Sequence, residues 1–360
     1  MLNINASKIL IFSDIHFGIS RDSMFKMQSN IAVIDWIIET CISRKIDKII
    51  FMGDWFDNRN SISTITMNNA YNQFKKFSEN NIELFLIVGN HDTTFKNSND
   101  INSLNIFREI NNVHIFHSLT ELTFNNKLTG LFCPWQCWNN IDATKKYNFV
   151  FGHFEYGMIN ETADSLKTSL LTSISPLVFS GHFHTREEKI FNSSSILNIG
   201  SPLELTWSDY ENQKGVYILD LKTREYEFVE NHISPIHKKY YWSKLRDKSV
   251  KLSEKDIKNN YIKLIVDDKY NYENIIKINN KILDMKAAKS DVEFVFNFNN
   301  SMNSNYDAGD FSNMSSMSNI DYVCKYIDTI KDMLNSSDID PEEIKTLMRT
   351  YYNNAQGNID

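Results

Sequence analysis

One pattern occurs five times in the first half of the chain and limits the folds that the chain can adopt. In each copy a short apolar run ends in a cluster of Gly, Asp, Asn and His. Continuous apolar runs are typical of strands buried on both faces. Clusters that follow such strands are expected at the carboxyl edge of a sheet, where open α/β folds place their chemistry. The runs and their clusters are Lys8–Phe12 with Ser13–His16, Lys48–Met52 with Gly53–Asp54, Leu84–Val88 with Gly89–Asp92, Phe149–Phe151 with Gly152–His153, and Leu177–Phe179 with Gly181–His182.

Helical patterns separate the early strands. Apolar residues recur at helical spacing between Ile31 and Ile42 and again between Tyr71 and Phe77, which predicts two helices. A β-α-β start followed by strand-rich chain predicts an α/β fold with a layered sandwich core, which we place at residues 1–235. Three further strands are expected to close this core, at Ile196–Ile199, Gly215–Leu221 and Tyr226–Val229.

The chain becomes rich in lysine after the core. We expect residues 236–298 to form a small basic α+β capping domain. Its strands are predicted at Tyr261–Val266 and Val292–Phe298, with a helix within Tyr272–Ala288 between them. Between Ser234 and Ser290 there are 14 Lys and Arg residues but 7 Asp and Glu residues, although the whole chain has a net charge of -7. Such a segment is either a surface for a phosphate backbone or a solvated lysine-rich face.

The last part of the chain is predicted to be a linker and a helical segment. Residues 299–319 are rich in Asn, Ser and Met without periodicity, which is typical of a flexible linker. A helical pattern returns over residues 320–356, and Asp340-Pro341 is a plausible helix start because Pro suits the first turn. Terminal helices of this kind either dock on a partner or pack on their own core.

Composition and segment patterns indicate a cytoplasmic protein. Hydrophobic residues make up 42% of the chain, enough for a buried core. The first residues show no signal peptide, and no apolar run approaches the roughly 18 residues of a membrane span. The four cysteines have no framework spacing, which favours reduced thiols.

The first two clusters supply donors that suit a metal ion. Asp14 and His16 lie two residues apart at a strand end, so both side chains are expected to face the same way. Asp54 follows Gly53, and its two oxygens can bridge two cations, while Asp57 can orient a metal ligand. Any one of these clusters is more often a structural turn than a metal site.

The remaining clusters add a neutral oxygen and several imidazoles. Asn90 offers an amide oxygen, and His91 is offset from the ligand positions, where a histidine can protonate a leaving oxygen. We expect Asp92 to hold the tautomer of His91 and raise its basicity. Carboxylate, imidazole and amide donors together suit Mn, Fe or Zn rather than Ca. Three more imidazole donors come from the last two clusters, at His153, His182 and His184.

The series D-x-H, G-D-x-x-D, G-N-H-D, a lone G-H and G-H-x-H resembles the signature of the calcineurin-like metallophosphoesterase superfamily, with every motif present and in order. The resemblance implies a two-metal site. Asp54 would bridge the two ions and His91 would be the general acid, with Asp92 beside it. By the same resemblance the first metal would be held by Asp14, His16 and His184, and the second by Asn90, His153 and His182.

Two differences from the motifs of one branch of the superfamily indicate which subfamily the chain resembles. Asn58 after Asp57 and Asp92 after His91 disfavour the phosphoprotein phosphatases. Gly18 and the segment Asn198–Pro202 resemble SbcD-type DNA-repair nucleases, and Gly152–Glu155 with the compact length is similar to tailed-phage recombination endonuclease subunits. This implies a Mn-dependent exonuclease on duplex ends and endonuclease on single strands. An SbcC-type ATPase would bind the C-terminal helices, and a phage-encoded protein would act in the host cell cytoplasm.

The resemblance also implies a homodimer. The helix after His16 is a candidate interface because Met24, Phe25 and Met27 lie near its start, although such residues also suit a core. Two other functions stay open. One is a nucleotide or small-molecule phosphodiesterase on the same core, and the other is a scaffold that has lost catalysis and only recruits the ATPase.

Overall fold

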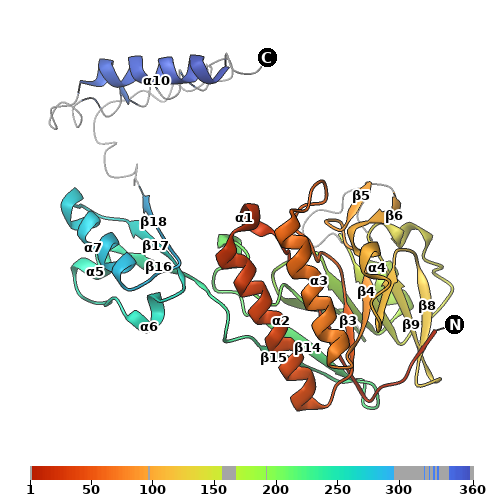
Figure 1. Ribbon diagram of the computed structural model, residues 1–360. Coiled ribbons are helices and arrows are strands. Elements are labelled where there is room, and N and C mark those ends of the chain that lie inside the picture. The colour runs from red at the N-terminus through yellow and green to blue at the C-terminus, as the bar shows by residue number, and fades with distance from the viewer. Residues whose placement is uncertain are drawn as a thin grey trace. The chain divides into compact units, whose positions relative to one another are not determined.

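The structure is a computed structural model, and by its internal contacts the chain divides into two units, Met1–Val295 and Phe296–Asp360. The first unit holds three larger sheets and a small hairpin (Figure 1). The expected linker at 299–319 lies outside the described residues. The structure describes residues 2–95, 98–155, 168–191, 193–295, 320, 324, 327, 328, 331 and 340–356.

A six-stranded sheet carries the first three polar clusters. Its strand order is β15-β14-β2-β3-β4-β7; the four strands β2, β3, β4 and β7 run parallel, and β14 is antiparallel to β2. All three N-terminal strands and the two late strands of this sheet were expected from their apolar runs. The bounds are β2 (Lys8–Phe12), β3 (Lys48–Phe51), β4 (Glu83–Ile87), β7 (Val113–Phe116), β14 (Gly215–Asp220) and β15 (Tyr226–Glu230).

A seven-stranded sheet carries the last two clusters. Its order is β1-β8-β9-β10-β11-β13-β12, and the strands β9, β10, β11 and β13 run parallel. A separate hairpin pairs β5 (Thr93–Phe95) with β6 (Ser98–Asn102). The bounds in the large sheet are β1 (Leu2–Ile4), β8 (Thr120–Phe124), β9 (Leu128–Cys133), β10 (Phe149–His153), β11 (Leu177–Gly181), β12 (Glu187–Phe191) and β13 (Ser194–Asn198).

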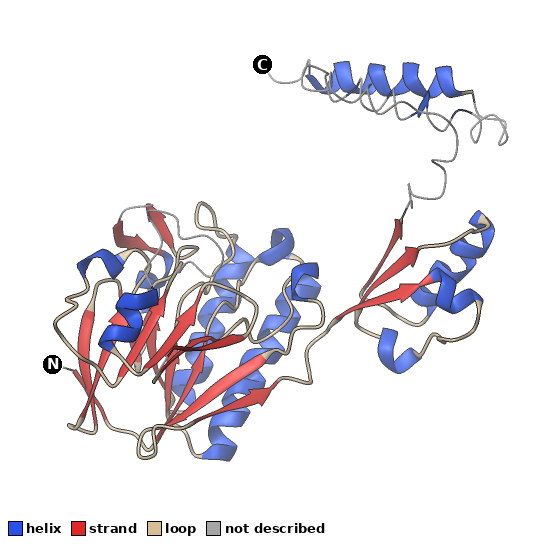
Figure 2. Ribbon diagram, turned by 180° about the vertical axis from the view of Figure 1, so that it is seen from behind, coloured by secondary structure: helices blue, strands red, loops and turns tan. Residues whose placement is uncertain are grey.

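Helices cover the outer faces of both sheets, as the view from behind shows (Figure 2). Helices α2 and α3 include the two segments predicted to be helical, and the Ser63 side chain accepts a hydrogen bond from the Thr66 N–H at the start of α3. The bounds of the helices in the core are α1 (Ile19–Asp22), α2 (Met24–Arg44), α3 (Thr64–Glu79) and α4 (Thr168–Ile174), with 3-10 turns at Ser103–Phe107, Cys137–Asn140 and Trp207–Asp209.

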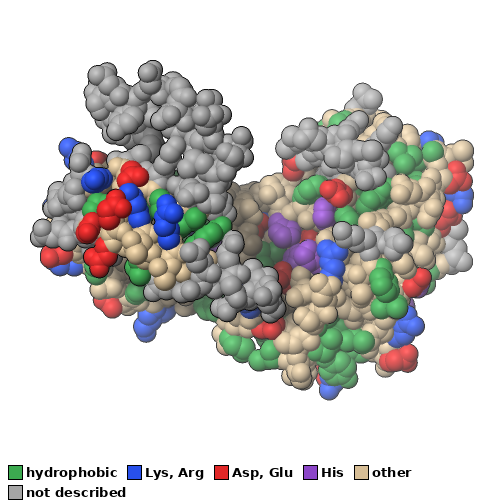
Figure 3. Space-filling model, turned by 90° about the horizontal axis from the view of Figure 1, so that it is seen from above, with side chains coloured by type: hydrophobic (Ala, Val, Ile, Leu, Met, Phe, Trp, Pro, Cys, Tyr) green, Lys and Arg blue, Asp and Glu red, His purple; other side chains and the backbone are tan. Residues whose placement is uncertain are grey.

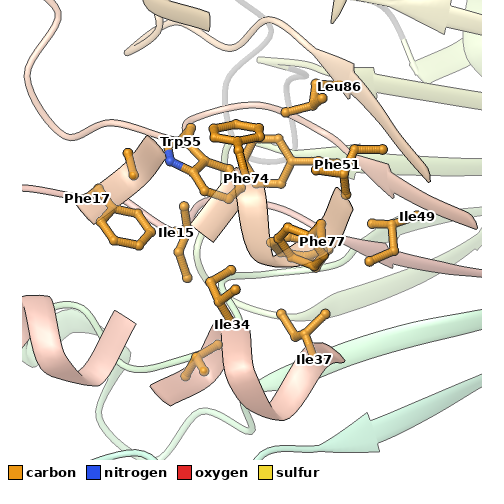
Figure 4. Close-up of a cluster of buried hydrophobic side chains, with 14 of the residues drawn as sticks. Ile15, Phe17, Ile34, Ile37, Ile49, Phe51, Trp55, Phe74, Phe77 and Leu86 are labelled. Atoms are coloured by element: carbon orange, nitrogen blue, oxygen red, sulfur yellow. The ribbon is translucent and has the colours of Figure 1, made fainter. Parts of the chain in front are cut away.

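The continuous apolar strands follow from this layering. Side chains alternate along a strand, so Ile9 and Ile11 enter the layer between the two sheets, whereas Leu10 and Phe12 pack toward the helices. Figure 4 shows the helix-facing layer, in which Phe74 and Phe77 lie among strand and helix side chains. The core is thus a helix-sheet-sheet-helix sandwich, which confirms the expected fold class.

The region after the core forms a small all-parallel sheet of β16 (His237–Tyr241), β17 (Tyr261–Val266) and β18 (Lys289–Phe294). Strand β17 is where the sequence predicts it. Strand β18 begins before the expected Val292, and β16 was not expected because its sequence, HKKYY, is mostly polar and only two of its residues are buried. The helices of this region are α5 (Trp242–Arg246), α6 (Glu254–Ile257) and α7 (Tyr272–Asp284).

The side chains at the start of α2 pack largely against other parts of the same chain. Met27 is buried, and the ring of Phe25 packs edge-on against Tyr261 with centroids 5.6 Å apart. Of the three residues considered for a dimer interface, Met24 remains 50% exposed.

In the second unit, α10 (Pro341–Gln356) begins at the expected Asp340-Pro341 pair. Within the residues that the structure describes, no helix is long and apolar enough to cross a membrane.

Candidate metal centre

The five polar clusters meet at the carboxyl ends of strands from both sheets. Strands β2, β3 and β4 of the six-stranded sheet deliver three of them, and β10 and β11 of the seven-stranded sheet deliver two. The expectation of a single sheet edge is therefore wrong, because the site lies where two stacked sheets end side by side. Figure 3 shows histidine side chains gathered in a hollow on one face of the molecule.

The backbone bends sharply at the candidate ligands. Asp14, His16, Asp54 and His182 have φ values of 55°, 50°, 62° and 86°. These left-handed conformations cost on the order of 1–3 kcal/mol each for residues with a side chain. The expected strand alternation at Asp14 and His16 is therefore wrong. Both residues lie beyond β2 in a loop whose amides bond to the next loop, with Asp14 N–H donating to the Gly53 carbonyl over 3.0 Å.

Glycine allows the loops from the two sheets to approach closely. Gly53 has a φ of 101°, and a Cβ there would lie 2.5 Å from Nδ1 of His153. A Cβ at Gly181 would lie 2.3 Å from Oγ of Ser13. Both contacts are far shorter than van der Waals distance, so any side chain at either glycine would push the two loops apart.

Asp14, His16 and His184 form a first group of donors. The Nε2 atoms of the two imidazoles face each other at 3.1 Å, and Oδ1 of Asp14 lies 3.9 Å from His16 Nε2 and 4.0 Å from His184 Nε2. That carboxylate oxygen is buried, and it has no hydrogen-bond partner among the described residues. Burying a carboxylate oxygen without a hydrogen-bond donor costs free energy unless a cation binds to that oxygen.

Asp54, Asn90, His153 and His182 form a second group. The Asn90 side-chain oxygen lies 2.8 Å from Nε2 of His153 and 2.9 Å from Nδ1 of His182. The other ring nitrogen of His153, Nδ1, faces the Met52 carbonyl at 2.7 Å, so Nε2 is the nitrogen that faces the other members of this group. Burial lowers the pKa of His182 to about 4, so this imidazole is neutral and ready to bind a metal.

Asp54 stands between the two groups. Its Oδ2 lies 3.7 Å from Nε2 of His16 and 3.3 Å from Nε2 of His153, while its Oδ1 accepts the His91 backbone N–H over 2.8 Å. A single oxygen therefore faces both groups. Metal–ligand bonds of about 2.0–2.2 Å place neighbouring donors about 3 to 3.5 Å apart, which is close to these spacings, so the residues present fit two cations.

Protonated imidazoles balance the buried carboxylates when no cation is bound. Burial alone would lower the pKa of His16, but the nearby carboxylates of Asp14, Asp57 and Asp54 outweigh it and raise the pKa to about 10. The charge of Asp54 likewise outweighs burial and raises the pKa of His153 to about 9. A divalent cation that binds these imidazoles must displace their protons.

His91 lies beside the first group, but its partner differs from the expected one. Its Nδ1 faces the backbone carbonyl of Asp57 at 2.5 Å, so Nδ1 carries the proton and Nε2 is left for chemistry. Both oxygens of the buried Asp92 accept backbone N–H groups instead, Oδ2 from Asp54 and Oδ1 from Trp55. The expected pairing of Asp92 with the His91 ring is therefore wrong, and Asp92 holds the ligand loops together.

Asp57, which was predicted to orient a metal ligand, lies near His16. Its Oδ1 lies 3.4 Å from Nδ1 of His16. Two further residues at the site were not singled out from the sequence. Asn30 on α2 is fully buried and donates to the Ile15 carbonyl over 2.9 Å. The Trp135 ring packs on His182 with centroids 5.0 Å apart. A polar residue within an apolar helix face was the available signal for Asn30.

A family model described as calcineurin-like phosphoesterase matches residues 7–266. That span is most of the chain, and the chain belongs to the calcineurin-like phosphoesterase family. It is 30% identical to exonuclease subunit 1 of Enterobacteria phage T4 over 270 residues, covering 72% of this chain and 76% of the phage protein. It is 33% identical to a subunit of the SbcCD nuclease of Escherichia coli K12 over 97 residues, or 26% of this chain and 24% of that protein. These matches make the chain a metal-dependent phosphodiesterase.

Two solved structures are matched at lower similarity. One is a novel archaeal phosphodiesterase, with a TM-score of 0.37, 16% identity, and coverage of 62% of this chain and 99% of that chain. The other is GAP50, the anchor in the inner membrane complex of Plasmodium, with a TM-score of 0.39, 13% identity, and coverage of 63% and 89%.

Proposed function

We propose that this chain is a two-metal DNA nuclease, with Mn as the physiological ion. The observation that carries the proposal is the single oxygen of Asp54 that faces both donor groups, with His91 beside one of them. We assign the first ion to Asp14, His16 and His184, and the second to Asn90, His153 and His182, with Asp54 shared. Bound cations would activate the attacking water and neutralise the phosphate.

His91 is the proposed general acid. Its Nδ1–H donates to the Asp57 carbonyl, which fixes the ring, and in the imidazolium form its Nε2–H can give a proton to the leaving sugar oxygen, which leaves the neutral imidazole. The His16 and His91 rings are 4.8 Å apart, so the proton donor stands next to the first donor group. The leaving alkoxide is a strong base, and protonation lowers the barrier to its departure.

DNA is the proposed substrate because of the relatives and the charge of the capping region, residues 236–298. The T4 relative is an exonuclease and the Escherichia coli relative a nuclease subunit. In the capping region, lysines such as Lys244, Lys248 and Lys251 are exposed, as a phosphate-binding surface requires. We propose exonuclease action on duplex ends and endonuclease action on single strands.

An SbcC-type ATPase is the proposed partner, bound through the C-terminal helical segment. Helix α10 exposes Leu347 by 52% and Met348 by 43%, so it presents apolar side chains to a partner. Leu347→Asp would then remove stimulation by the ATPase and leave basal activity unchanged. We also propose a homodimer, in which the exposed Met24 would lie at the interface.

The decisive experiment is hydrolysis of labelled linear duplex and single-stranded DNA with Mn, with and without the cognate ATPase. The proposal expects cutting that rises with the ATPase and disappears in His91→Ala. Hydrolysis of bis(p-nitrophenyl) phosphate without any cutting of DNA would favour a small-molecule or nucleotide phosphodiesterase. Protein that binds metal and the ATPase but hydrolyses neither substrate would favour the scaffold.

A further inference from the structure

A buried lysine lies directly behind one of the candidate ligands. Lys214 precedes β14, and its Nζ donates to the His184 carbonyl over 2.6 Å, to Ser201 Oγ over 3.1 Å and to Asp209 Oδ1 over 2.7 Å. An ammonium group has three donors, and all three are used. Burying a charge is costly unless it is paired and fully hydrogen-bonded, as this one is.

The peptide of His184 is held from two sides. Its carbonyl accepts the Lys214 Nζ bond and also the Ser201 backbone N–H over 3.1 Å, so both lone pairs of the oxygen are used. Gly200 has a φ of 72°, and a Cβ there would come within 2.8 Å of the same carbonyl. The main chain at His184 therefore has little room to shift.

Asp209 fixes the other end of this contact. Its Oδ1 accepts from Lys214, and its Oδ2 accepts the backbone N–H groups of Leu205 and Thr206. The pair thus joins the His184 carbonyl to the loop formed by residues 200–210. Neither Asp209 nor Lys214 has an atom among the candidate metal donors.

The 200–210 loop is also fastened to the capping region. Oε2 of Glu204 accepts from His237, both from its backbone N–H over 2.5 Å and from Nδ1 at 2.8 Å. The His237 ring stacks on Tyr261 with centroids 4.8 Å apart. On another side, Lys26 donates to the Leu205 carbonyl over 2.9 Å. The loop therefore contacts the ligand segment, α2 and the capping sheet.

We infer that Lys214, held by Asp209, is a positioning residue that fixes His184 for the first metal ion. The inference rests on the proposed two-metal assignment and adds a residue that binds neither metal nor substrate. His184 sits on a loop that is partly open to solvent, whereas His16 and Asp14 are buried. The first donor group therefore depends on Lys214 to keep its third donor in place.

The test is a titration of the metal-free protein with Mn²⁺ alone, in which electron paramagnetic resonance of free Mn²⁺ gives the number and affinity of bound ions. Substituting a residue that orients a ligand costs about 10- to 100-fold in metal affinity. In Lys214→Met we expect one of the two ions to bind about 10- to 100-fold more weakly, and the other to keep the affinity that it has in the wild-type protein.

Lys26→Met is the matched control. Lys26 is 5% exposed and Lys214 is 6% exposed, and both hold the 200–210 loop, but Lys26 bonds to Glu204 and Leu205 and not to His184. Both Mn²⁺ affinities should be unchanged in this variant. The double variant Asp209→Asn/Lys214→Met removes both charges together, so that no unpaired charge is buried. It should also bind one of the two Mn²⁺ ions more weakly than the wild-type protein does.

Three results would overturn the inference. One is two wild-type affinities in folded Lys214→Met or in the double variant. The second is an equal loss of affinity for both ions in Lys214→Met and in Lys26→Met, which would indicate that either substitution simply loosens the loop. The third is a wild-type protein that binds fewer than two Mn²⁺ ions, which would overturn the two-metal assignment as well.

Discussion

The metal centre and the capping region differ in how they hold their charges. At the metal centre, carboxylates and imidazoles lie within hydrogen-bond or near-contact distance of one another in a buried setting, and the backbone is strained to bring them there. In the capping region the charges are mostly lysines at the surface, and pairs such as Lys238–Asp256 are 34% and 45% exposed. Exposed pairs of this kind contribute about 0 to 1 kcal/mol.

This difference sets the size of the effects to expect. A buried donor group acts through atomic positions, so one lost atom changes binding and rate by large factors. A basic surface acts through summed, screened charge, so one lost lysine has a small effect that depends on salt. The following variants test whether the two regions really divide in this way.

Asp54→Asn should have the largest effect. The carboxylate oxygen that faces both donor groups becomes part of a neutral amide, and transition-state stabilisation of several kcal/mol is lost. We expect phosphodiester hydrolysis to fall by more than about 1,000-fold, which corresponds to about 4 kcal/mol, with metal content falling too. Rate and bound Mn²⁺ are both measured. Two bound ions and a wild-type rate in this variant would contradict the bridging role.

His91→Ala should have the next largest effect on the rate of DNA cleavage and should leave metal binding unchanged. Loss of a general acid lowers the rate by about 10² to 10⁴-fold. Because p-nitrophenolate leaves without a proton, hydrolysis of bis(p-nitrophenyl) phosphate should fall far less than DNA cleavage. Rates on both substrates and metal content by elemental analysis are compared. Equal losses on the two substrates would argue that His91 acts by some means other than protonation.

Metal affinity should rise with pH. In the ion-free protein the pKa values of His16 and His153 are raised to about 10 and about 9, so both imidazoles are protonated near neutral pH and must lose their protons to bind a cation. Affinity is therefore expected to increase from about pH 6 to pH 9 and to level off above the raised pKa values. Calorimetry in two buffers of different ionisation enthalpy counts the protons released, and a count of zero would exclude this exchange.

Lysine substitutions in the capping region should have the smallest effect. Replacing Lys244, Lys248 and Lys251 by alanine should lower the salt dependence of DNA binding by about 1 in logarithmic slope for each lysine that contacts a phosphate. Hydrolysis of bis(p-nitrophenyl) phosphate should stay unchanged. Lys75→Ala on α3 is the matched exposed control in the core. An unchanged slope in the triple variant would mean that these lysines form only a solvated face.

The sequence alone predicted features that depend on local burial. Apolar runs on both faces of a strand encode a sheet covered on both sides, so the helices α2 and α3, the start of α10 and eight core strands could be predicted, namely β2, β3, β4, β10, β11, β13, β14 and β15. The other strands of the two core sheets, β1, β7, β8, β9 and β12, were not predicted. The polar clusters, read in order, also predicted the donors that the structure brings together around Asp54. Strand β16 was not predicted because a half-exposed strand of lysine and tyrosine has no continuous apolar run.

Only the tertiary structure decided which polar atoms meet. It placed the clusters at the ends of two sheets, turned the backbone at Asp14 and His16 into left-handed conformations, gave His91 the Asp57 carbonyl, and set Lys214 behind His184. Periodicity records how deeply a residue is buried, because burial repeats with the geometry of its own strand or helix. The partner of a polar atom depends on the packing of segments distant in sequence, and no local pattern records it.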